Sequence, residues 1–426
     1  MATRGFITRR AVFCVAALAL AAGSLFSADW PQWRGPNRDS VYNDRLTLNW
    51  PPKVLWRKAD IGKSLSGIVV ADGTLILHYR QDGQEVVRAL DASSGNDLWK
   101  QAYDQPLPDE AGRGYGNWPR STPAITGGLV YTLGYAGKLY ATELKTGKVA
   151  WNVDTFAEFK HNKQNVQALN FGVTASPLVA GGKVFIPQGT WAKWRMVALD
   201  AKSGAVAWTA LENRQPSYSA SYSSPMPFRI GKMDLVACDG CIFSPADGTV
   251  YSRRLAGGIA TPVVSEDVMV QSCGPVNNET TPYTLAYKLA VKDDKAEASR
   301  LWKNEVLGRC DSTAVVYQGH LYAQVSDLAK PSPKGLKCVE LATGKEVWCE
   351  KKSYDDYYGA IILVGDKLLV LMENGELTLV DASPAGYNER GRMKVAGKTM
   401  SHPALANGRL YVRDDKELVC LDMSEK

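Results

Sequence analysis

A short repeated pattern constrains the fold of this chain more than any other feature. Four segments align without gaps, each with an acidic residue four positions before a Gly and a Trp four positions after it: residues 89–99, 141–151, 198–208 and 338–348. This spacing predicts a β-hairpin in which the carboxylate accepts hydrogen bonds from turn amides and the Gly takes a positive φ. The Trp starts the next strand and offers its ring to the seam between neighbouring sheets. Repetition of such a unit predicts stacked sheets.

A second marker opens each repeat. It is a Ser/Thr-Pro-like step, followed by a short β run, a turn that contains Gly and another β run. Eight openings occur, at residues 66–68, 122–124, 176–178, 224–226, 261–263, 313–315, 359–361 and 402–404. Their spacing suits four short strands per unit, so we predict an all-β, eight-bladed β-propeller with four-stranded antiparallel blades. The expected structural blade tryptophans are Trp56, Trp99, Trp151, Trp208, Trp302 and Trp348.

The eighth unit ends after three strands, near Asp422. Residues 54–58 near the other end of the chain read as a fourth strand with its own Trp56 and have no preceding partner. We therefore predict that this segment completes blade eight and closes the ring, which removes the exposed edges of an open sheet.

The first residues predict a signal peptide. Arg4, Arg9 and Arg10 precede an uncharged apolar run at 11–20, which is too short to span a bilayer. We expect cleavage after Ser24 or Ala28 and assign three segments: a signal peptide at 1–28, an N-terminal arm at 29–53 and the propeller at 54–426. The mature chain should then be periplasmic or extracellular, without a transmembrane segment, and the export route, Sec or twin-arginine, stays open.

Charge and cysteine content limit the partners. The formal charge is +6, and three of the basic residues lie in the leader, so the surface is nearly balanced and no basic stripe indicates a nucleic acid. We expect a monomer that binds a protein or a small polar ligand. One of the eight Cys lies in the leader, which leaves an odd number. Cys338 and Cys349 flank a turn symmetrically, so a structural disulfide between them is possible.

Signatures of enzymes are missing from the sequence. The four His are scattered over different blades, so we predict no metal site. Cys238 and Cys241 form a CxxC across an Asp-Gly turn between two strands, where a local bridge or two free thiols is expected, not redox chemistry. No nucleophile elbow, P-loop or dinucleotide motif occurs at a strand-to-helix junction.

The segments before the eight openings should converge on one end of the central channel, where they offer hydrogen-bonding and stacking groups. A ligand site at this mouth is one interpretation; mutual pairing around a water-filled channel is the other. Lys63 also belongs to this rim, and the predicted ligand-binding residues are Trp118, Arg120, Asn170, Tyr218, Tyr222, Arg254, Arg309, Asp311, Asp355, Tyr357 and His402.

The repeated Ala-x-Asp-x-x-x-Gly-x-x-x-Trp pattern resembles the PQQ-like (pyrrolo-quinoline quinone) repeat β-propeller family, which includes quinoprotein dehydrogenases and BamB. Residues 29–36 also resemble a leader segment of exported members. Active dehydrogenases of the family carry adjacent cysteines beside the cofactor, and this chain has no Cys-Cys pair. We therefore expect no cofactor and a non-catalytic binding or interaction scaffold in the cell envelope.

Two alternatives to the scaffold stay open. The first is a PQQ-dependent alcohol or sugar dehydrogenase, in which Asp311 or Asp355 acts as a base or holds Ca²⁺. The second is a polysaccharide-binding propeller that uses the aromatic side chains at the mouth.

Overall fold

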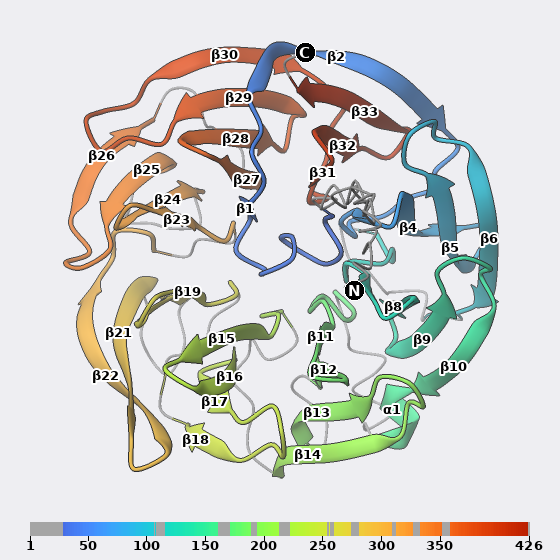
Figure 1. Ribbon diagram of the computed structural model, residues 1–426, viewed down its shortest axis with the longest axis horizontal. Helices are drawn as coiled ribbons and strands as arrows, with labels where there is room; N and C mark the ends of the chain where they lie inside the picture. The colour runs from blue at the N-terminus through green and yellow to red at the C-terminus, as the bar shows by residue number, and fades with distance from the viewer. Residues whose placement is uncertain are drawn as a thin grey trace, which may run out of the picture.

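Eight blades of four antiparallel strands surround a central axis, as the sequence predicts, and one of these sheets gains a fifth, parallel strand from the N-terminal arm (Figure 1). The computed structural model describes residues 29–105, 107, 116–160, 171–188, 194–212, 222–253, 255, 260–273, 281–308, 312–326, 333–351 and 358–424. In the described part of the chain no helix is both long and apolar enough to cross a membrane.

Blades one to four follow one another around the ring, and each innermost strand comes first in the sequence. Blade one contains β3 (Val69–Ala71), β4 (Thr74–Gln81), β5 (Gln84–Asp91) and β6 (Asp97–Asp104). Blade two contains β7 (Ala124–Thr126), β8 (Leu129–Leu133), β9 (Lys138–Glu143) and β10 (Val149–Asp154), followed by the short helix α1 (Thr155–Glu158). Blades three and four contain β11 (Leu178–Ala180), β12 (Lys183–Pro187), β13 (Trp194–Asp200), β14 (Val206–Glu212), β15 (Met226–Ile230), β16 (Met233–Cys238), β17 (Cys241–Phe243) and β18 (Val250–Ser252).

Blades five to eight repeat this order. Blade five contains β19 (Val263–Ser265), β20 (Val268–Cys273) and the long hairpin β21 (Tyr283–Lys292) to β22 (Lys295–Asn304). Blades six and seven contain β23 (Val315–Tyr317), β24 (His320–Val325), β25 (Gly335–Glu340), β26 (Glu346–Glu350), β27 (Gly359–Val364), β28 (Lys367–Met372), β29 (Glu376–Asp381) and β30 (Glu389–Lys394). Blade eight contains β31 (Ala404–Ala406), β32 (Arg409–Arg413), β33 (Glu417–Ser424) and β2 (Leu48–Ala59).

The ring closes as predicted, through the N-terminal strand. β2 lies outermost in blade eight and pairs antiparallel with β33, with Val54 opposite Leu421 and Trp56 opposite Cys420. Figure 1 shows this blue strand beside the red C-terminal strands. The closing strand is longer than the predicted segment, and Trp50 within it lies against Gly391 of blade seven. Blade seven, which lacks the repeat Trp, therefore receives an indole from β2.

The repeat motif builds the seams between blades. The Trp99 indole of blade one donates a hydrogen bond to the carbonyl of Leu144 in blade two at 2.8 Å. Its ring lies so close to Gly147 that an added Cβ would stand 2.7 Å from it. Equivalent indole-to-carbonyl bonds run from Trp151 to Ala201, Trp208 to Pro245, Trp302 to Leu341 and Trp348 to Ser383. The Gly of one repeat thus receives the Trp of the preceding repeat, which explains why both are needed.

The turn chemistry also matches the prediction. The Asp91 carboxylate accepts hydrogen bonds from the backbone amides of Ser93 and Ser94 at 3.0 and 2.8 Å. Hydrogen bonds from the Ser93 and Ser94 hydroxyls lower the pKa of Asp91. Gly95 follows with φ of +73°, a left-handed conformation that favours glycine.

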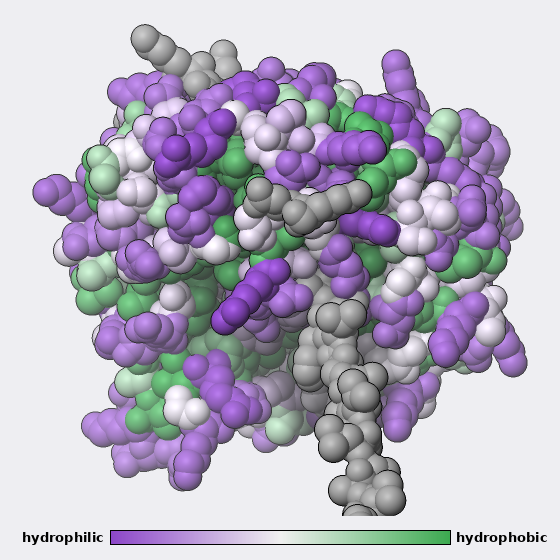
Figure 2. All heavy atoms as spheres, turned by 45° about the horizontal axis from the view of Figure 1, so that its top comes forward, coloured by the Kyte–Doolittle hydropathy of each residue, from purple (hydrophilic) through white to green (hydrophobic). Residues whose placement is uncertain are grey.

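The core lies between adjacent sheets. Leu133 and Leu139 of blade two, for example, form one buried cluster with Val184 and Val197 of blade three. Apolar side chains that stay exposed include Leu98, Val206, Leu301 and Val347, which come from outer strands of different blades. The face in Figure 2 is accordingly dominated by polar side chains with apolar ones between them.

The predicted disulfide is wrong. Cys338 lies opposite Trp348, and Cys349 lies opposite Lys337. Because neighbouring residues of a strand point to opposite faces, the two thiols face opposite sides of the sheet, and both are free. In the CxxC, Cys238 of β16 and Cys241 of β17 lie opposite each other across a tight turn. Both thiols are buried and free, so they form no disulfide.

Substitution of seam glycines should separate backbone strain from ring contact. Gly147 and Gly182 both have φ of +74°, but an added Cβ at Gly182 meets nothing within 4 Å. We expect Gly182→Ala to lower the free energy of unfolding by about 1–2 kcal/mol, the cost of the left-handed conformation. Gly147→Ala should cost more, and the excess should shrink when Trp99→Ala removes the ring. Urea denaturation of Gly182→Ala, Gly147→Ala, Trp99→Ala and the double variant Gly147→Ala/Trp99→Ala tests this. Equal losses of unfolding free energy for Gly147→Ala and Gly182→Ala would contradict the seam contact.

Candidate functional site

A chain of Ser and Thr hydroxyls links the blade openings around the axis. The backbone amide of Gly67 donates to Thr122 Oγ1, and that of Thr122 donates to Ser176 Oγ, both at 3.0 Å. The next two contacts, from Ser176 to Ser224 and from Ser224 to Thr261, are each 2.9 Å. These hydroxyls are buried, and each accepts a hydrogen bond from a buried amide of the preceding blade. The Ser/Thr of the opening marker therefore links adjacent blades, and we call this set of hydrogen bonds the Ser/Thr clasp.

The structure limits the N-terminal arm to residues 30–42, because the closing strand β2 already begins at Leu48. This arm runs through the channel that the openings surround. It enters beside blade one, where Trp30 and Val70 exchange two backbone hydrogen bonds of 2.9 Å. It leaves at blade seven as β1 (Val41–Tyr42), which pairs parallel with the innermost strand β27. Figure 1 shows this dark blue segment in the middle of the ring.

Two arginines of the arm are buried in the channel. Arg34 and Arg38 have 1% and 0% of their surface exposed. Arg38 donates to the carbonyls of Pro177 and Ser176 at 2.9 and 3.1 Å. Arg34 donates to the carbonyl of Ala314 at 2.5 Å, on the other side of the ring. The arm therefore connects blades three and six through its side chains.

These guanidinium groups place positive charge on the axis. Burial lowers the pKa of Arg38 to about 9, and the nearby charge of Arg34 contributes in the same direction. Arg38 stays protonated at neutral pH. The carbonyls of Ser176 and Pro177 and the side-chain oxygen of Gln32 accept hydrogen bonds from this cation.

Trp33 stacks between these cations and the channel mouth. The guanidinium carbons of Arg34 and Arg38 lie 5.6 and 5.4 Å from the centre of its ring, within the range of cation–π attraction. Its ring meets the His402 imidazole edge-on at 5.5 Å.

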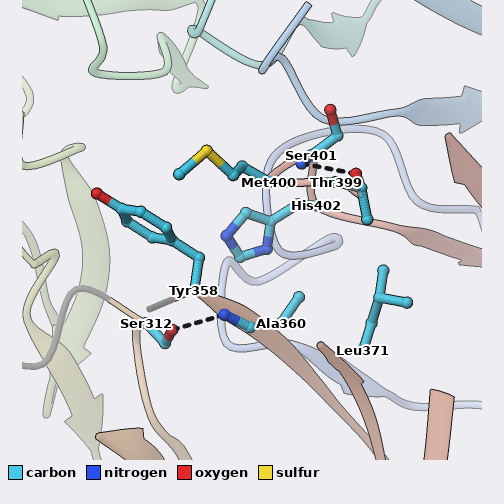
Figure 3. A pocket seen from close by; sticks show the side chains of 9 residues that line it. Ser312, Tyr358, Ala360, Leu371, Thr399, Met400, Ser401 and His402 are labelled. Atoms are coloured by element: carbon cyan, nitrogen blue, oxygen red, sulfur yellow. Dashed lines mark hydrogen bonds between the residues drawn. The ribbon is translucent and has the colours of Figure 1, made fainter. Parts of the chain in front are cut away.

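A small pocket opens beside His402, between blades seven and eight (Figure 3). His402 points into it together with Tyr358 and Ser312. The cavity measures about 40 Å³. A second cavity of about 10 Å³ lies between blades five and six and shares Ser312.

The predicted mouth residues have several environments. His402 lies at the pocket, as described above. Lys63 Nζ stands 5.1 Å from the Trp118 ring centre. Arg120 is held by the carbonyls of Phe171 and Gly116 at 2.6 and 2.8 Å.

The Tyr222 ring contacts Phe171 edge-on, so part of the predicted mouth is internally paired. The remaining predicted residues lie outside the described part of the chain: Asn170, Tyr218, Arg254, Arg309, Asp311, Asp355 and Tyr357.

The sequence prediction missed Trp33, Arg34 and Arg38, because it placed the ligand groups only on the loops before the openings. The signal was present, since residues 30–42 contain two arginines and two tryptophans together with Pro and Gly. Nothing local to that segment indicates that it folds into the channel.

A buried polar cluster joins blades one and two outside this site. Tyr103 donates a hydrogen bond to Glu85 at 2.7 Å, and His78 Nε2 lies 3.2 Å from the same carboxylate oxygen. The amide of Tyr135 in blade two donates to Glu85 at 2.8 Å. Burial alone would raise the pKa of Glu85, but the hydrogen bond and charge of His78, with Tyr103 and Tyr135, hold it below its ordinary value. Because the side chains of His78 and Glu85 are fully buried, this cluster reads as a seam contact.

Similarity to known proteins shows the family of this chain. The family described as outer membrane protein assembly factor BamB matches residues 82–350, more than half of the chain. The chain belongs to this BamB-type PQQ-like repeat family. A BamB from Moranella endobia is 25% identical over 305 residues, which cover 70% of this chain and 57% of that protein.

Quinone-dependent enzymes are also similar to this member of the BamB-type family. A quinone alcohol dehydrogenase subunit from Komagataeibacter europaeus is 30% identical over 197 residues, 44% of this chain. The match spans only 24% of that subunit's length.

Solved structures share the fold with both groups. BamB from Moraxella catarrhalis gives a TM-score of 0.58 at 15% identity and covers 87% of this chain and 100% of its own. Quinohemoprotein alcohol dehydrogenase from Comamonas testosteroni gives 0.61 at 13% identity, with coverages of 94% and 81%. At these identities the likeness shows the fold alone, so function has to come from the site.

The channel environment should make stability depend on the protonation of His402. Burial, with a smaller effect of the Arg34 charge, lowers the pKa of His402 to about 3, against about 6.5 in the unfolded chain. As pH falls below 6.5 the unfolded state takes up the proton first, so stability falls by up to about 1.4 kcal/mol per pH unit until about pH 3. Urea denaturation at pH 7 and pH 5 should show a smaller loss for His402→Gln than for the wild type. His320→Gln, at a hairpin turn, is the control, and identical losses for wild type and His402→Gln would contradict the prediction.

Proposed function

We propose that this protein is a non-catalytic binding scaffold for protein partners in the cell envelope. The observation that supports this most is that the chain's own arm fills the axis of the ring, with Trp33, Arg34 and Arg38 in the channel. A ligand on that axis would have to share space with close-packed side chains. While the arm is in place, partners are therefore expected on the outer faces and at the mouth, and a partner in the channel has to take the place of the arm.

The described residues give little support to a site for PQQ with Ca²⁺. Two cavities that they line, of about 40 and 10 Å³, are each far below the roughly 300–1,000 Å³ of ordinary small-molecule sites. Among the described residues, no group of three or more His, Cys, Asp or Glu is placed to hold a metal ion. The sequence also lacks the adjacent cysteines expected beside that cofactor.

The extent of the match to a BamB supports the proposed scaffold role. The BamB from Moranella endobia, whose name describes an assembly factor, aligns with 70% of this chain, against 44% for the alcohol dehydrogenase subunit. The near-balanced charge, and the apolar side chains spread over outer strands, suit contacts with other proteins.

Cofactor titration tests the scaffold against the dehydrogenase. We expect purified protein to show no saturable change in fluorescence with PQQ and Ca²⁺, and no dye-linked oxidation of alcohols or sugars. A quinoprotein dehydrogenase reconstituted in parallel controls for the quality of the reagents. Saturable binding with turnover would overturn the proposal.

Export is part of the proposal, because the charged start and apolar run of the leader are typical of a signal peptide. Expression of the full chain with a C-terminal tag should give a shortened protein outside the cytoplasm, and N-terminal sequencing should read from Leu25 or Asp29. Replacement of Leu18 and Leu20 by Arg should keep the chain in the cytoplasm at full length. A full-length wild-type protein in the cytoplasm would contradict export.

A further inference from the structure

The wall of the channel binds the arm much as a receptor binds a peptide. The Ile125 amide of blade two donates to the Pro31 carbonyl at 2.7 Å, and the Leu363 amide of blade seven donates to the Ser40 carbonyl at 2.9 Å. With the Trp30 and β1 contacts, these bonds add the arm to inner strands through its backbone, a recurring mode of peptide recognition. Main-chain groups of the wall therefore bind the arm whatever its side chains are.

The channel wall recognises side chains of the arm through its two arginines. The carbonyls of Ser176 and Pro177 both accept from Arg38, and the carbonyl of Ala314 accepts from Arg34. These carbonyls precede the innermost strands of blades three and six, so two blades that are not neighbours present acceptors to the arm. A cation with several N–H donors, as in Arg, matches such acceptors better than Lys does.

The backbone of the arm is held in unfavourable conformations. Arg34, Arg38 and Ser40 have φ of +62°, +60° and +61°, in the left-handed region that L residues seldom adopt. Three such residues within seven positions form a turned segment. Bonds within the arm, such as that from the Ser40 amide to the Arg34 carbonyl at 2.9 Å, hold this segment together with the contacts to the wall.

The arm is joined to the propeller by a short exposed linker. Residues 43–45 are exposed and lie between β1 and the closing strand β2. Every contact described for residues 30–42 with the blades is non-covalent. A break in this linker would leave blade eight complete and the arm held only by its binding interactions.

We propose that the axial channel is a binding site for a peptide that pairs with inner strands at its two ends and turns between them, with an aromatic residue and two arginines four positions apart, and that the arm is its ligand in this chain. The site can then exchange the arm for a segment of the same chemistry. This inference rests on the proposed scaffold role and names the ligand chemistry for it.

A cleaved linker tests the proposal on the folded protein. Residues 43–45 are replaced by a protease site, the protein is purified and then cut, and size-exclusion chromatography with mass spectrometry measures how much arm stays bound. We expect the arm to co-elute with the propeller and to exchange with a fluorescent synthetic peptide of residues 29–42, followed by anisotropy. An arm that is lost at once, or that never exchanges, would overturn the proposal.

Competing peptides test the role of the arginines. A peptide with Arg34→Gln and Arg38→Gln should compete at least about tenfold more weakly than the wild-type peptide, because charge-assisted hydrogen bonds are lost. Pro36→Ala, at an exposed position, is the matched control and should compete like the wild type. Equal competition by the Arg-substituted peptide would show that the arginine side chains do not contribute to binding. Cofactor titration is independent of these measurements, so failure of the peptide experiment leaves the test of the scaffold intact.

Discussion

The contact between an indole of one blade and the glycine turn of the next is the interaction on which the rest of this ring depends. Trp99 lies over Gly147 and donates its N–H to Leu144, and other seams repeat that arrangement. A sheet with one unburied face is unstable alone, so each blade is completed by its neighbours. The outer seams are held by indoles and the inner seams by the Ser/Thr clasp, which together fix the angle between sheets.

Closure of the ring makes this interaction continuous. Blade eight borrows β2, so Trp56 lies over Gly95 of blade one. Its indole N–H has no hydrogen-bond partner among the described residues, although the Ala92 carbonyl at the corresponding place accepts from Tyr411 at 2.9 Å. In the seam between blades two and three, by contrast, the Ala201 carbonyl accepts from both Tyr131 and Trp151. The closing seam thus keeps the ring packing without the indole hydrogen bond.

The channel has a different physical character from the seams. Arg34 and Arg38 bring charge into a site without water-exposed surface, where an isolated cation is costly. Carbonyl acceptors and the face of Trp33 offset that cost, and the same positive charge helps to keep His402 neutral. A fold shared with an assembly factor and a quinone enzyme is here occupied on its axis by residues 30–42 of its own chain.

Much of the fold follows from the sequence alone. The acidic residue, Gly and Trp of each repeat act within a few residues of one another, so turn chemistry and strand period locate the hairpins. The stray Trp56 indicates the closing strand for the same reason. Where the prediction depended on side-chain direction, as for Cys338 and Cys349, a bulge in the register placed the two thiols on opposite faces.

The sequence by itself determined the eight blades, their turns and the strand that closes them, because those features arise from local geometry repeated along the chain. Only the tertiary structure decided that residues 30–42 fill the channel. Arg38 and Arg34 bind carbonyls that lie 139 and 280 positions away, on blades that meet only when the ring is complete. A buried arginine and an exposed one look alike in sequence, and the acceptors that distinguish them come from the closed ring.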